Sequence, residues 1–331
     1  MNHFEKLAEY EKKGAIAKDL AAILRNFYIS YGEAVVENGY TAEDIQPILD
    51  TFLERVILQL AHPYTFEPYH QHLRQPFDYY RFGLDVIRPL VVFDKSKVRG
   101  INHIDTIEAA LKRGENAILL SNHQTEPDPQ AISLLLEKTH PRFAEEMIFV
   151  AGHRVISDPL AVPFSKGRNL LCIYSKRHIE TDPSLKEERL LHNQRTMKKM
   201  GQLLAEGGKC IYVAPSGGRD RPGPEGHVGV APFDPQSIEL FSLIAKNSGR
   251  VTHFHPLALA TYNLLPPPSS IEKDLGERRQ AHCTPIHLAF GSAIPMDTFL
   301  GSDTADKKER RQKRADYIWK LVATDYAALL K

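Results

Sequence analysis

Apolar positions recur at helical spacing through the first quarter of the chain. Two stripes each mark one face of a helix. The first consists of Ile16, Leu20, Ile23, Leu24, Phe27 and Tyr31, and the second of Ile45, Ile48, Leu49, Phe52, Val56 and Leu60. Asn38-Gly39 predicts the end of the first helix, and Thr41 with Asp44 predicts a capping-box start for the second. We therefore expect a small helical domain over residues 1–80.

Beyond residue 81, short apolar runs alternate with helical segments. The runs predicted as strands are 90–93, 117–121, 147–151, 170–174, 209–214, 255–260 and 286–290. The helices expected around them cover 104–113, the segment after Pro129, 185–206, 238–246 and 317–330, the last as a solvated surface element. This alternation is typical of an α/β fold with a mixed, mostly parallel sheet covered by helices. Residues 81–331 are predicted to form this second domain, after an irregular, aromatic connection over 62–89.

A polar stretch follows the predicted strand 117–121, namely Ser121-Asn122-His123-Gln124-Thr125-Glu126-Pro127-Asp128. Sites in open α/β sheets lie at the carboxyl ends of strands. Asp128, followed by Pro129, predicts the N-cap of the next helix, so the loop is short and held at both ends. Such a loop can place the carboxylate against the His123 imidazole, which leaves a basic Nε2 to take a proton from an alcohol. A hydrogen-bonded structural histidine and a plain helix cap are the alternative interpretation.

Basic residues follow two further predicted strands. Strand 170–174 runs into Ser175-Lys176-Arg177-His178, and strand 209–214 runs into Pro215-Ser216-Gly217-Gly218-Arg219-Asp220-Arg221-Pro222-Gly223. The paired glycines allow a tight turn with exposed N–H groups, and two arginines at alternate positions can offer forks to one anion. If these strands end at the same sheet edge as His123, the residues form a phosphate site.

Composition narrows the classes of function. The 331 residues include 42 Lys and Arg against 41 Asp and Glu, so the chain has no large net positive charge that would attract nucleic acid or a membrane surface. No apolar stretch reaches the ~20 residues of a membrane-spanning helix, and the acidic N-terminus has neither a secretory signal nor a transit-peptide pattern. We expect no nucleic-acid partner, at most peripheral membrane contact, and reduced buried thiols at the three cysteines, Cys172, Cys210 and Cys283.

Several of these motifs resemble those of a known enzyme family. Asn-His-x-x-x-x-Asp after a buried strand resembles the first motif of the glycerolipid acyltransferases. Segments 151–160, 167–178, 214–222, 255–258 and 266–268 follow in the order found in the soluble, plastid-type glycerol-3-phosphate acyltransferases, a type also carried by chlamydia-like bacteria. The third motif, Pro-Ser-Gly-Gly-Arg-Asp-Arg-Pro, departs from the Phe-Pro-Glu-Gly-Thr-Arg-Ser of the wider superfamily but is similar to this branch. Arg177 stands where the branch commonly has Lys.

The resemblance implies a catalytic domain that joins a fatty acyl group to the sn-1 hydroxyl of glycerol 3-phosphate and gives lysophosphatidic acid. The donor would be a thioester on acyl carrier protein or coenzyme A, a co-substrate, with no further cofactor. His123 would be the general base and Asp128 its orienting partner, with backbone N–H groups or Asn122 as candidate oxyanion donors. The residues implied for phosphate binding are Arg177, His178, Arg219 and Arg221. The implied compartment is the bacterial cytoplasm, or the plastid stroma if a transit peptide has been removed.

Four alternatives remain at this stage. One is a lysophosphatidate acyltransferase, which shares the first motif. Another is a hydrolase with Ser216 as nucleophile, although Pro-Ser-Gly-Gly differs from the Gly-x-Ser-x-Gly elbow. A third is a catalytically silent module that binds phosphate or a carrier protein. A metal site is disfavoured because His123 and Asp128 supply only two of the ligands that zinc needs.

Acyl carrier proteins are acidic, so a basic patch beside the acyl cleft would favour them as donor. Two candidate patches are Lys307, Lys308, Arg310, Arg311, Lys313 and Arg314, and the pair Lys198 and Lys199. A solvated helix face explains both patches equally well.

Overall fold

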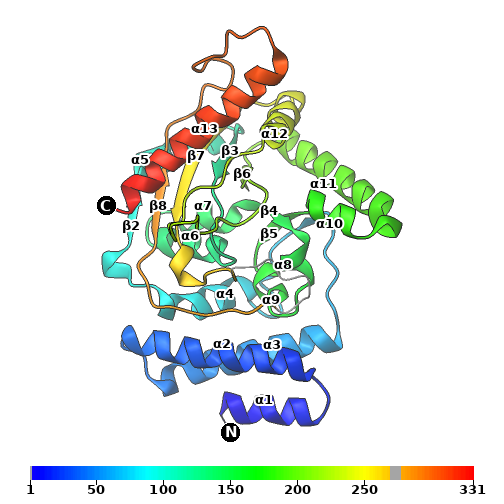
Figure 1. Ribbon diagram of the computed structural model, residues 1–331, viewed down its shortest axis with the longest axis vertical. Helices are drawn as coiled ribbons and strands as arrows, with labels where there is room; N and C mark the ends of the chain where they lie inside the picture. The colour runs from blue at the N-terminus through cyan, green and yellow to red at the C-terminus, as the bar shows by residue number, and fades with distance from the viewer. Residues whose placement is uncertain (1, 269–276) are drawn as a thin grey trace.

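The computed structural model describes residues 2–268 and 277–331, except for the side chains of Lys176 and Arg177. Helices α1 (His3–Lys12), α2 (Lys18–Glu37) and α3 (Ala42–Ala61) form a layer at one end of the molecule (Figure 1). Thr41 and Asp44 make both hydrogen bonds of the predicted capping box at the start of α3. The predicted N-terminal helices are therefore confirmed.

The described residues form a sheet of eight strands in the order β1-β5-β4-β6-β3-β7-β8-β2. Their bounds are β1 Tyr69–His70, β2 Lys97–Arg99, β3 Asn116–Ser121, β4 Ile148–Gly152, β5 Asn169–Ile173, β6 Cys210–Val213, β7 Thr252–Ala260 and β8 His287–Phe290. The five central strands, β5 to β7 in that order, are parallel, whereas β1 and β8 run antiparallel to their inner neighbours. The carboxyl ends of five strands therefore meet at one edge, and the predicted mixed, mostly parallel fold is confirmed.

Helices cover both faces of this sheet (Figure 1). The larger ones are α4 Tyr79–Ile87, α5 Ile101–Lys112, α6 Asp128–Leu136, α11 Lys186–Glu206, α12 Pro235–Asn247 and α13 Lys307–Leu329, and the short helix α7 Pro141–Glu146 follows α6. Shorter ones, α8 His153–Ser157, α9 Val162–Ser165 and α10 Lys176–Thr181, lie at the carboxyl edge of the strands. One buried cluster joins α11, α12 and α13 to one face, and another joins α5, α6 and α7 to the opposite face.

Three local predictions were wrong. Residues 90–93 form no strand: 3₁₀ turns at Arg88–Leu90 and Phe93–Lys95 flank a single bridge from Val91, and the edge strand is β2. Pro89 lacks an N–H for a strand ladder. The connection 62–89 contains a buried helix, α4, and strand β1. Helix α13 includes the charged run before residue 317 and packs on β7 and β8, so it is not a solvated surface element.

The helical layer and the sheet share buried contacts. A third apolar cluster includes Leu24 of α2 and Phe52 of α3 together with Ala131 and Leu134 of α6. The division at residue 80 stays a prediction, while β1 at Tyr69–His70 already pairs with β5. Within the described ranges, we find no helix with the length and apolar character needed to cross a membrane.

Candidate active site

The carboxyl edge of the parallel strands gathers most of the predicted polar residues. His123 follows β3, Arg219 and Arg221 follow β6, and His178 follows β5 on helix α10. Since β6 pairs with β3 and β4 separates β6 from β5, these loops succeed one another along a single edge. Convergence at one sheet edge, which the sequence pattern required for a shared site, is thus present.

His123 and Asp128 form a direct pair. Nδ1 of His123 lies 2.7 Å from Oδ2 of Asp128, and the imidazole is 30% exposed while the carboxylate is 1% exposed. A carboxylate can only accept, so Nδ1 carries the proton and Nε2 is left as the free basic atom. This geometry suits proton transfer from a substrate hydroxyl.

Asp128 lies in the first turn of α6 and does not cap it, because Pro127 is the N-cap residue. Its carboxylate instead reaches back to the loop. Oδ2 also accepts from the Gln124 N–H at 2.8 Å, and Oδ1 accepts from the Thr125 N–H at 3.3 Å and the Thr261 hydroxyl at 2.6 Å. Four donors therefore fix the carboxylate, which in turn fixes the ring of His123. Thr261, directly after β7, was missed by the sequence analysis.

Asn122 has a structural role. Its Nδ2 donates to Asp220 Oδ2 and to the Leu259 carbonyl, both at 2.9 Å, and its Oδ1 accepts from the Leu259 N–H at 2.8 Å. Both amide protons are used, and the residue is fully buried, so Asn122 has no donor left for an oxyanion. Burial raises the pKa of Asp220, although hydrogen bonds from Ala231 and Asn122 oppose that shift. The Asn122 side chain thus ties β7 and the loop after β6 to the base loop.

The arginines form an anion-binding cluster around an unexpected residue. Arg219 donates to both carboxylate oxygens of Glu277, at 2.6 and 2.7 Å, and Arg154 of α8 donates to Oε2 at 2.7 Å. Burial alone would raise the pKa of Glu277, but the two arginines hold it below its ordinary value. Arg154 and Glu277 were not predicted as site residues, because neither stands in a pattern with Arg219.

The other predicted phosphate residues lie around this cluster. Arg221 donates to the carbonyl of Pro268, and burial and then Arg219 lower the pKa of its guanidinium. Nδ1 of His178 is 3.0 Å from the Ser175 hydroxyl, and its ring packs edge-on against His153, the neighbour of Arg154. The side chain of Arg177 lies outside the described part of the structure.

Ser216 lies in a turn. Its hydroxyl donates to the Gly218 carbonyl at 3.0 Å, and Gly217 has a φ of +71°, a left-handed conformation that favours glycine. A serine bound to its own turn is poorly suited as a nucleophile. Within the described residues, His, Cys, Asp and Glu side chains gather nowhere in a group of three that could hold a metal ion.

The His–Asp pair at the carboxyl edge of the sheet suits an acyltransferase, and a family model described as Acyltransferase matches residues 95–258, which include this pair. The chloroplastic glycerol-3-phosphate acyltransferase ATS11 of Cucurbita moschata is 40% identical over 319 residues, which cover 96% of this chain and 71% of that protein. The chain belongs to the glycerol-3-phosphate acyltransferases, and the predicted family and activity are confirmed.

Two further proteins are similar to this chain. The chloroplastic glycerol-3-phosphate acyltransferase of Arabidopsis thaliana is 38% identical over 96% of this chain and 69% of its own length. The crystal structure of the 1-acyl-sn-glycerophosphate acyltransferase PlsC from Thermotoga maritima covers 76% of this chain and 78% of its own, at 17% identity and a TM-score of 0.40.

Proposed function

We propose that the chain transfers a fatty acyl group from a thioester directly to the sn-1 hydroxyl of glycerol 3-phosphate, with His123 as general base and no covalent acyl-enzyme. The observation that carries this proposal is the 2.7 Å contact of His123 with a carboxylate held by three further donors. A thioester is already activated, so one positioned base suffices. The chemistry uses no cofactor beyond the donor co-substrate.

The proposed step balances on these residues. The hydroxyl of glycerol 3-phosphate gives its proton to Nε2 of His123 while its oxygen forms a bond to the thioester carbonyl carbon. Asp128 stabilises the resulting imidazolium through Nδ1. When the tetrahedral intermediate collapses, the C–S bond breaks and the departing sulfur takes the proton from Nε2. The chain thus returns to its starting state with no residue modified.

We further propose that the arginine cluster holds the substrate phosphate. Arg154 and Arg219 already bind an anion, the Glu277 carboxylate, and their side chains are 18% and 15% exposed. Two guanidinium forks converging on one anion are well suited to a phosphate, which needs several charge-assisted bonds. Phosphate would then compete with Glu277 for the same donors, with Arg221, His178 and Arg177 completing the site.

Removing either arginine of the loop after β6 should weaken acceptor binding. We expect Arg219→Ala and Arg221→Ala each to raise KM for glycerol 3-phosphate about 10- to 100-fold, since a hydrogen bond to a charged group contributes roughly 1.5–3 kcal/mol. The measurement is steady-state kinetics at saturating acyl donor. Arg113→Ala is a matched control, because Arg113 pairs with Glu115 before β3, at the opposite edge of the sheet. An unchanged KM in both variants would refute the phosphate assignment.

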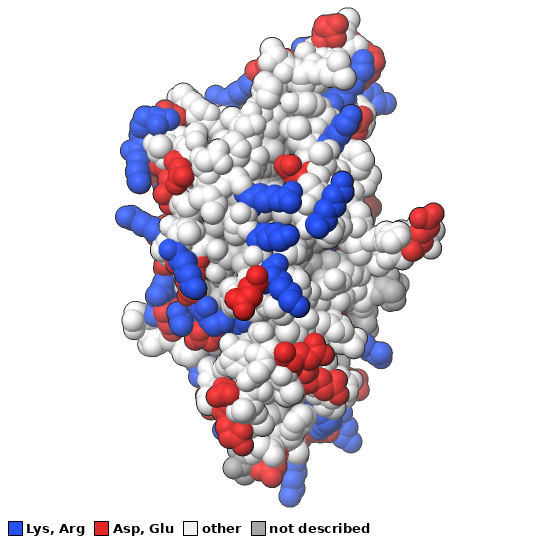
Figure 2. Space-filling model, turned by 90° about the vertical axis from the view of Figure 1, so that its left-hand side faces the viewer, with Lys and Arg blue, Asp and Glu red and all other residues white. Residues whose placement is uncertain are grey.

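For the donor, we propose acyl carrier protein, docked on the edge strand β2. Lys97 and Arg99 of β2 and Lys95 of the preceding 3₁₀ turn are exposed, and none of the three forms an ion pair with another described residue. Figure 2, which views the side of the molecule where β2 lies in Figure 1, shows Lys and Arg gathered midway along this face. Three exposed cations, two on β2 and one in the turn before it, suit an acidic protein.

The longer basic run proposed from the sequence is less suitable. In the run 307–314, Arg311 and Arg314 pair with Glu239 of α12, and Lys313 pairs with Glu309. This run opens a 23-residue helix whose opposite end, near Tyr326, approaches the base loop. The run therefore lies about 18 to 28 Å along the helix from Tyr326, at 1.5 Å of rise per residue.

Charge reversal distinguishes the two surfaces. Lys97→Glu with Arg99→Glu should lower kcat/KM for acyl carrier protein donors roughly tenfold at low salt, because complementary charge speeds encounter. The same double change at Lys307 and Lys308 serves as control and should leave kcat/KM near the wild-type value. A larger loss in the control, or equal losses in both variants, would move the docking surface away from β2.

The same observations bear on the alternative functions and on the compartment. Relatives named as glycerol-3-phosphate acyltransferases support this acceptor over lysophosphatidate. The pairing of His123 with Asp128 supports an enzyme over a silent binding module. The chloroplastic location of the relatives supports the plastid stroma for this chain, while the bacterial cytoplasm stays a prediction.

A further inference from the structure

One arginine joins the base loop to the arginine cluster. Arg279 donates from Nε and Nη2 to the two carboxylate oxygens of Glu126, at 2.8 and 3.0 Å. Glu126 belongs to the base loop between β3 and α6, where it stands between His123 and Asp128 in the chain. A bidentate bond of this kind fixes both the distance and the orientation of the carboxylate. The placement of the base loop therefore depends on where Arg279 lies.

The other contacts of Arg279 lead to the arginine cluster. Its Nη1 donates to the backbone carbonyl of Glu277 at 2.7 Å, and its Nη2 lies 3.2 Å from Oδ2 of Asp158. The side chain of the same Glu277 accepts from Arg154 and Arg219. A continuous set of contacts thus runs from the base loop through Arg279 and Glu277 to the two arginines.

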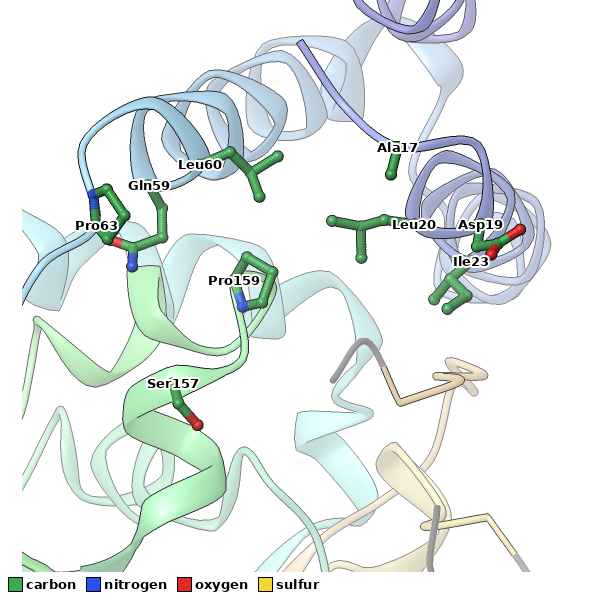
Figure 3. A pocket seen from close by; sticks show the side chains of 9 residues that line it. All are labelled: Ala17, Asp19, Leu20, Ile23, Gln59, Leu60, Pro63, Ser157 and Pro159. Atoms are coloured by element: carbon green, nitrogen blue, oxygen red, sulfur yellow. The ribbon is translucent and has the colours of Figure 1, made fainter. Parts of the chain in front are cut away.

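Asp158 anchors the far side of this link. It is fully buried, and its Oδ2 also accepts from the Glu277 N–H at 3.3 Å. Its chain neighbours Ser157 and Pro159 line a cavity of about 410 Å³ between α2, α3 and α8 (Figure 3), whereas Asp158 is not part of that lining. The Asp158 carboxylate therefore faces Arg279 and not the cavity.

The charges of this network balance. It consists of three carboxylates and three guanidinium groups, those of Glu126, Asp158, Glu277, Arg154, Arg219 and Arg279. Burial alone would lower the pKa of Arg279, but Glu126 and Asp158 raise it above its ordinary value, so the guanidinium stays charged. Desolvation offsets much of the attraction between buried ions, so such a network is a weak source of net stability. What it supplies is mainly a fixed position for its members.

The loop after β6 has its own tie to the base loop. The N–H of Asp220 donates to the His123 carbonyl at 2.6 Å, and its carboxylate accepts from Asn122. These contacts hold the end of the cluster that carries Arg219. Arg279 acts at the other end, where Arg154 follows β4 on α8. Contacts at both ends fix the angle between the base loop and the cluster as well as their distance.

The acceptor makes this relative position important. In glycerol 3-phosphate a three-carbon chain separates the phosphate from the sn-1 hydroxyl. With the phosphate on the arginine cluster, the hydroxyl reaches Nε2 of His123 only if the cluster and the base keep one relative position. A misplacement of about 1 Å can lower the rate by roughly 10²-fold.

We propose that Arg279 is a positioning residue that sets the position of the base loop relative to the phosphate site, and thereby the rate of acyl transfer to glycerol 3-phosphate. This proposal rests on the acyl transfer and the phosphate binding proposed above. Arg279 acts through Glu126 and Glu277 and needs no contact with either substrate. It stands in none of the motifs that follow the predicted strands, so the sequence pattern does not single it out.

Arg279→Lys tests this role. Lysine keeps the positive charge, but its single nitrogen cannot make the bidentate bond to Glu126 and reach the Glu277 carbonyl at the same time. We expect kcat for glycerol 3-phosphate to fall roughly 10- to 100-fold, the scale of a misplaced reacting group. KM, and the Kd from direct titration of glycerol 3-phosphate, should change little because Arg154 and Arg219 remain.

Arg88→Lys is the matched control. Arg88 makes a bidentate bond to Glu137, at 2.7 and 2.9 Å, at the opposite end of α6 from Asp128. Its replacement should leave kcat near the wild-type value. Equal losses of kcat in Arg88→Lys and Arg279→Lys would mean general damage from a lost ion pair and would overturn the positioning role.

Glu126→Gln tests the same link from its other side. It should lower kcat as Arg279→Lys does, and the double variant should lose no more than the more damaged single variant, because both changes remove one contact. Losses that multiply would show that the two residues act separately, which contradicts the link. If Arg279→Lys does not fold, wild-type kcat in Glu126→Gln overturns the proposal by itself.

The outcomes separate the link from the reaction. Wild-type kcat in Arg279→Lys, or a loss that lies wholly in KM, overturns the link while the formation of lysophosphatidic acid by wild type stands. A wild type that makes no lysophosphatidic acid overturns the proposed function and the link with it.

Discussion

His123→Ala is expected to lower kcat by roughly 10²- to 10⁴-fold, the span lost when a positioned general base is removed. Asp128 accepts a hydrogen bond from Nδ1 of the His123 imidazole, so Nε2 is the nitrogen left to take the proton. Binding of glycerol 3-phosphate should survive, because the phosphate is assigned to residues after β4, β5 and β6. The measurement is steady-state kinetics together with direct titration of the acceptor.

The control for this variant is His62→Ala. His62 is exposed at the end of α3, in the helical layer, so its loss should leave kcat unchanged. Both variants should melt near the wild-type temperature, since the His123 ring is partly exposed. Near wild-type turnover in His123→Ala would show that another group takes the proton.

Asp128→Asn should have an effect of similar size, up to about 10⁴-fold in kcat, as happens when the carboxylate behind a catalytic imidazole becomes an amide and favours the wrong tautomer. All four groups that face this carboxylate are donors: Nδ1 of His123, two backbone N–H groups and the Thr261 hydroxyl. An amide turns one acceptor into a donor, so one of these contacts becomes repulsive. The measurement is kcat with both substrates saturating.

Thr261→Val provides the graded control. It removes one hydrogen bond to Oδ1 but leaves the carboxylate and its contact with His123, so its kcat should fall far less than that of Asp128→Asn. If the two variants lost activity equally, Asp128 would matter for folding of the loop and not for the state of the imidazole. Circular dichroism of both variants distinguishes these cases.

The fold was predictable where the apolar pattern was decisive. The runs that form β3 to β8 are apolar and bounded by turn residues, so the local sequence already predicts buried strands there. The run 90–93 looked the same but forms 3₁₀ turns beside Pro89. The final helix, predicted over 317–330, was taken for a surface element, whereas α13 begins at Lys307 and packs on β7 and β8.

The site was predictable only in part. The His123–Asp128 spacing is local, and the structure brings the two side chains together. Arg154, Thr261 and Glu277 come from segments more than 25 residues away from His123, and only the strand order makes them neighbours. The sequence suggested Asn122 as a donor for the oxyanion, but its buried side-chain amide makes hydrogen bonds to backbone groups of Leu259 instead. Partners of this kind depend on topology, which no local motif records.

The most direct test of the account is the product made by wild type from labelled glycerol 3-phosphate and a palmitoyl or oleoyl thioester, on acyl carrier protein and in parallel on coenzyme A. We predict that wild type makes lysophosphatidic acid acylated at the sn-1 position and makes it faster from the carrier-protein donor. His123→Ala should make this product only at the rate left after the loss of roughly 10²- to 10⁴-fold in kcat. Free fatty acid in place of lysophosphatidic acid, or no product with either donor, would contradict the account.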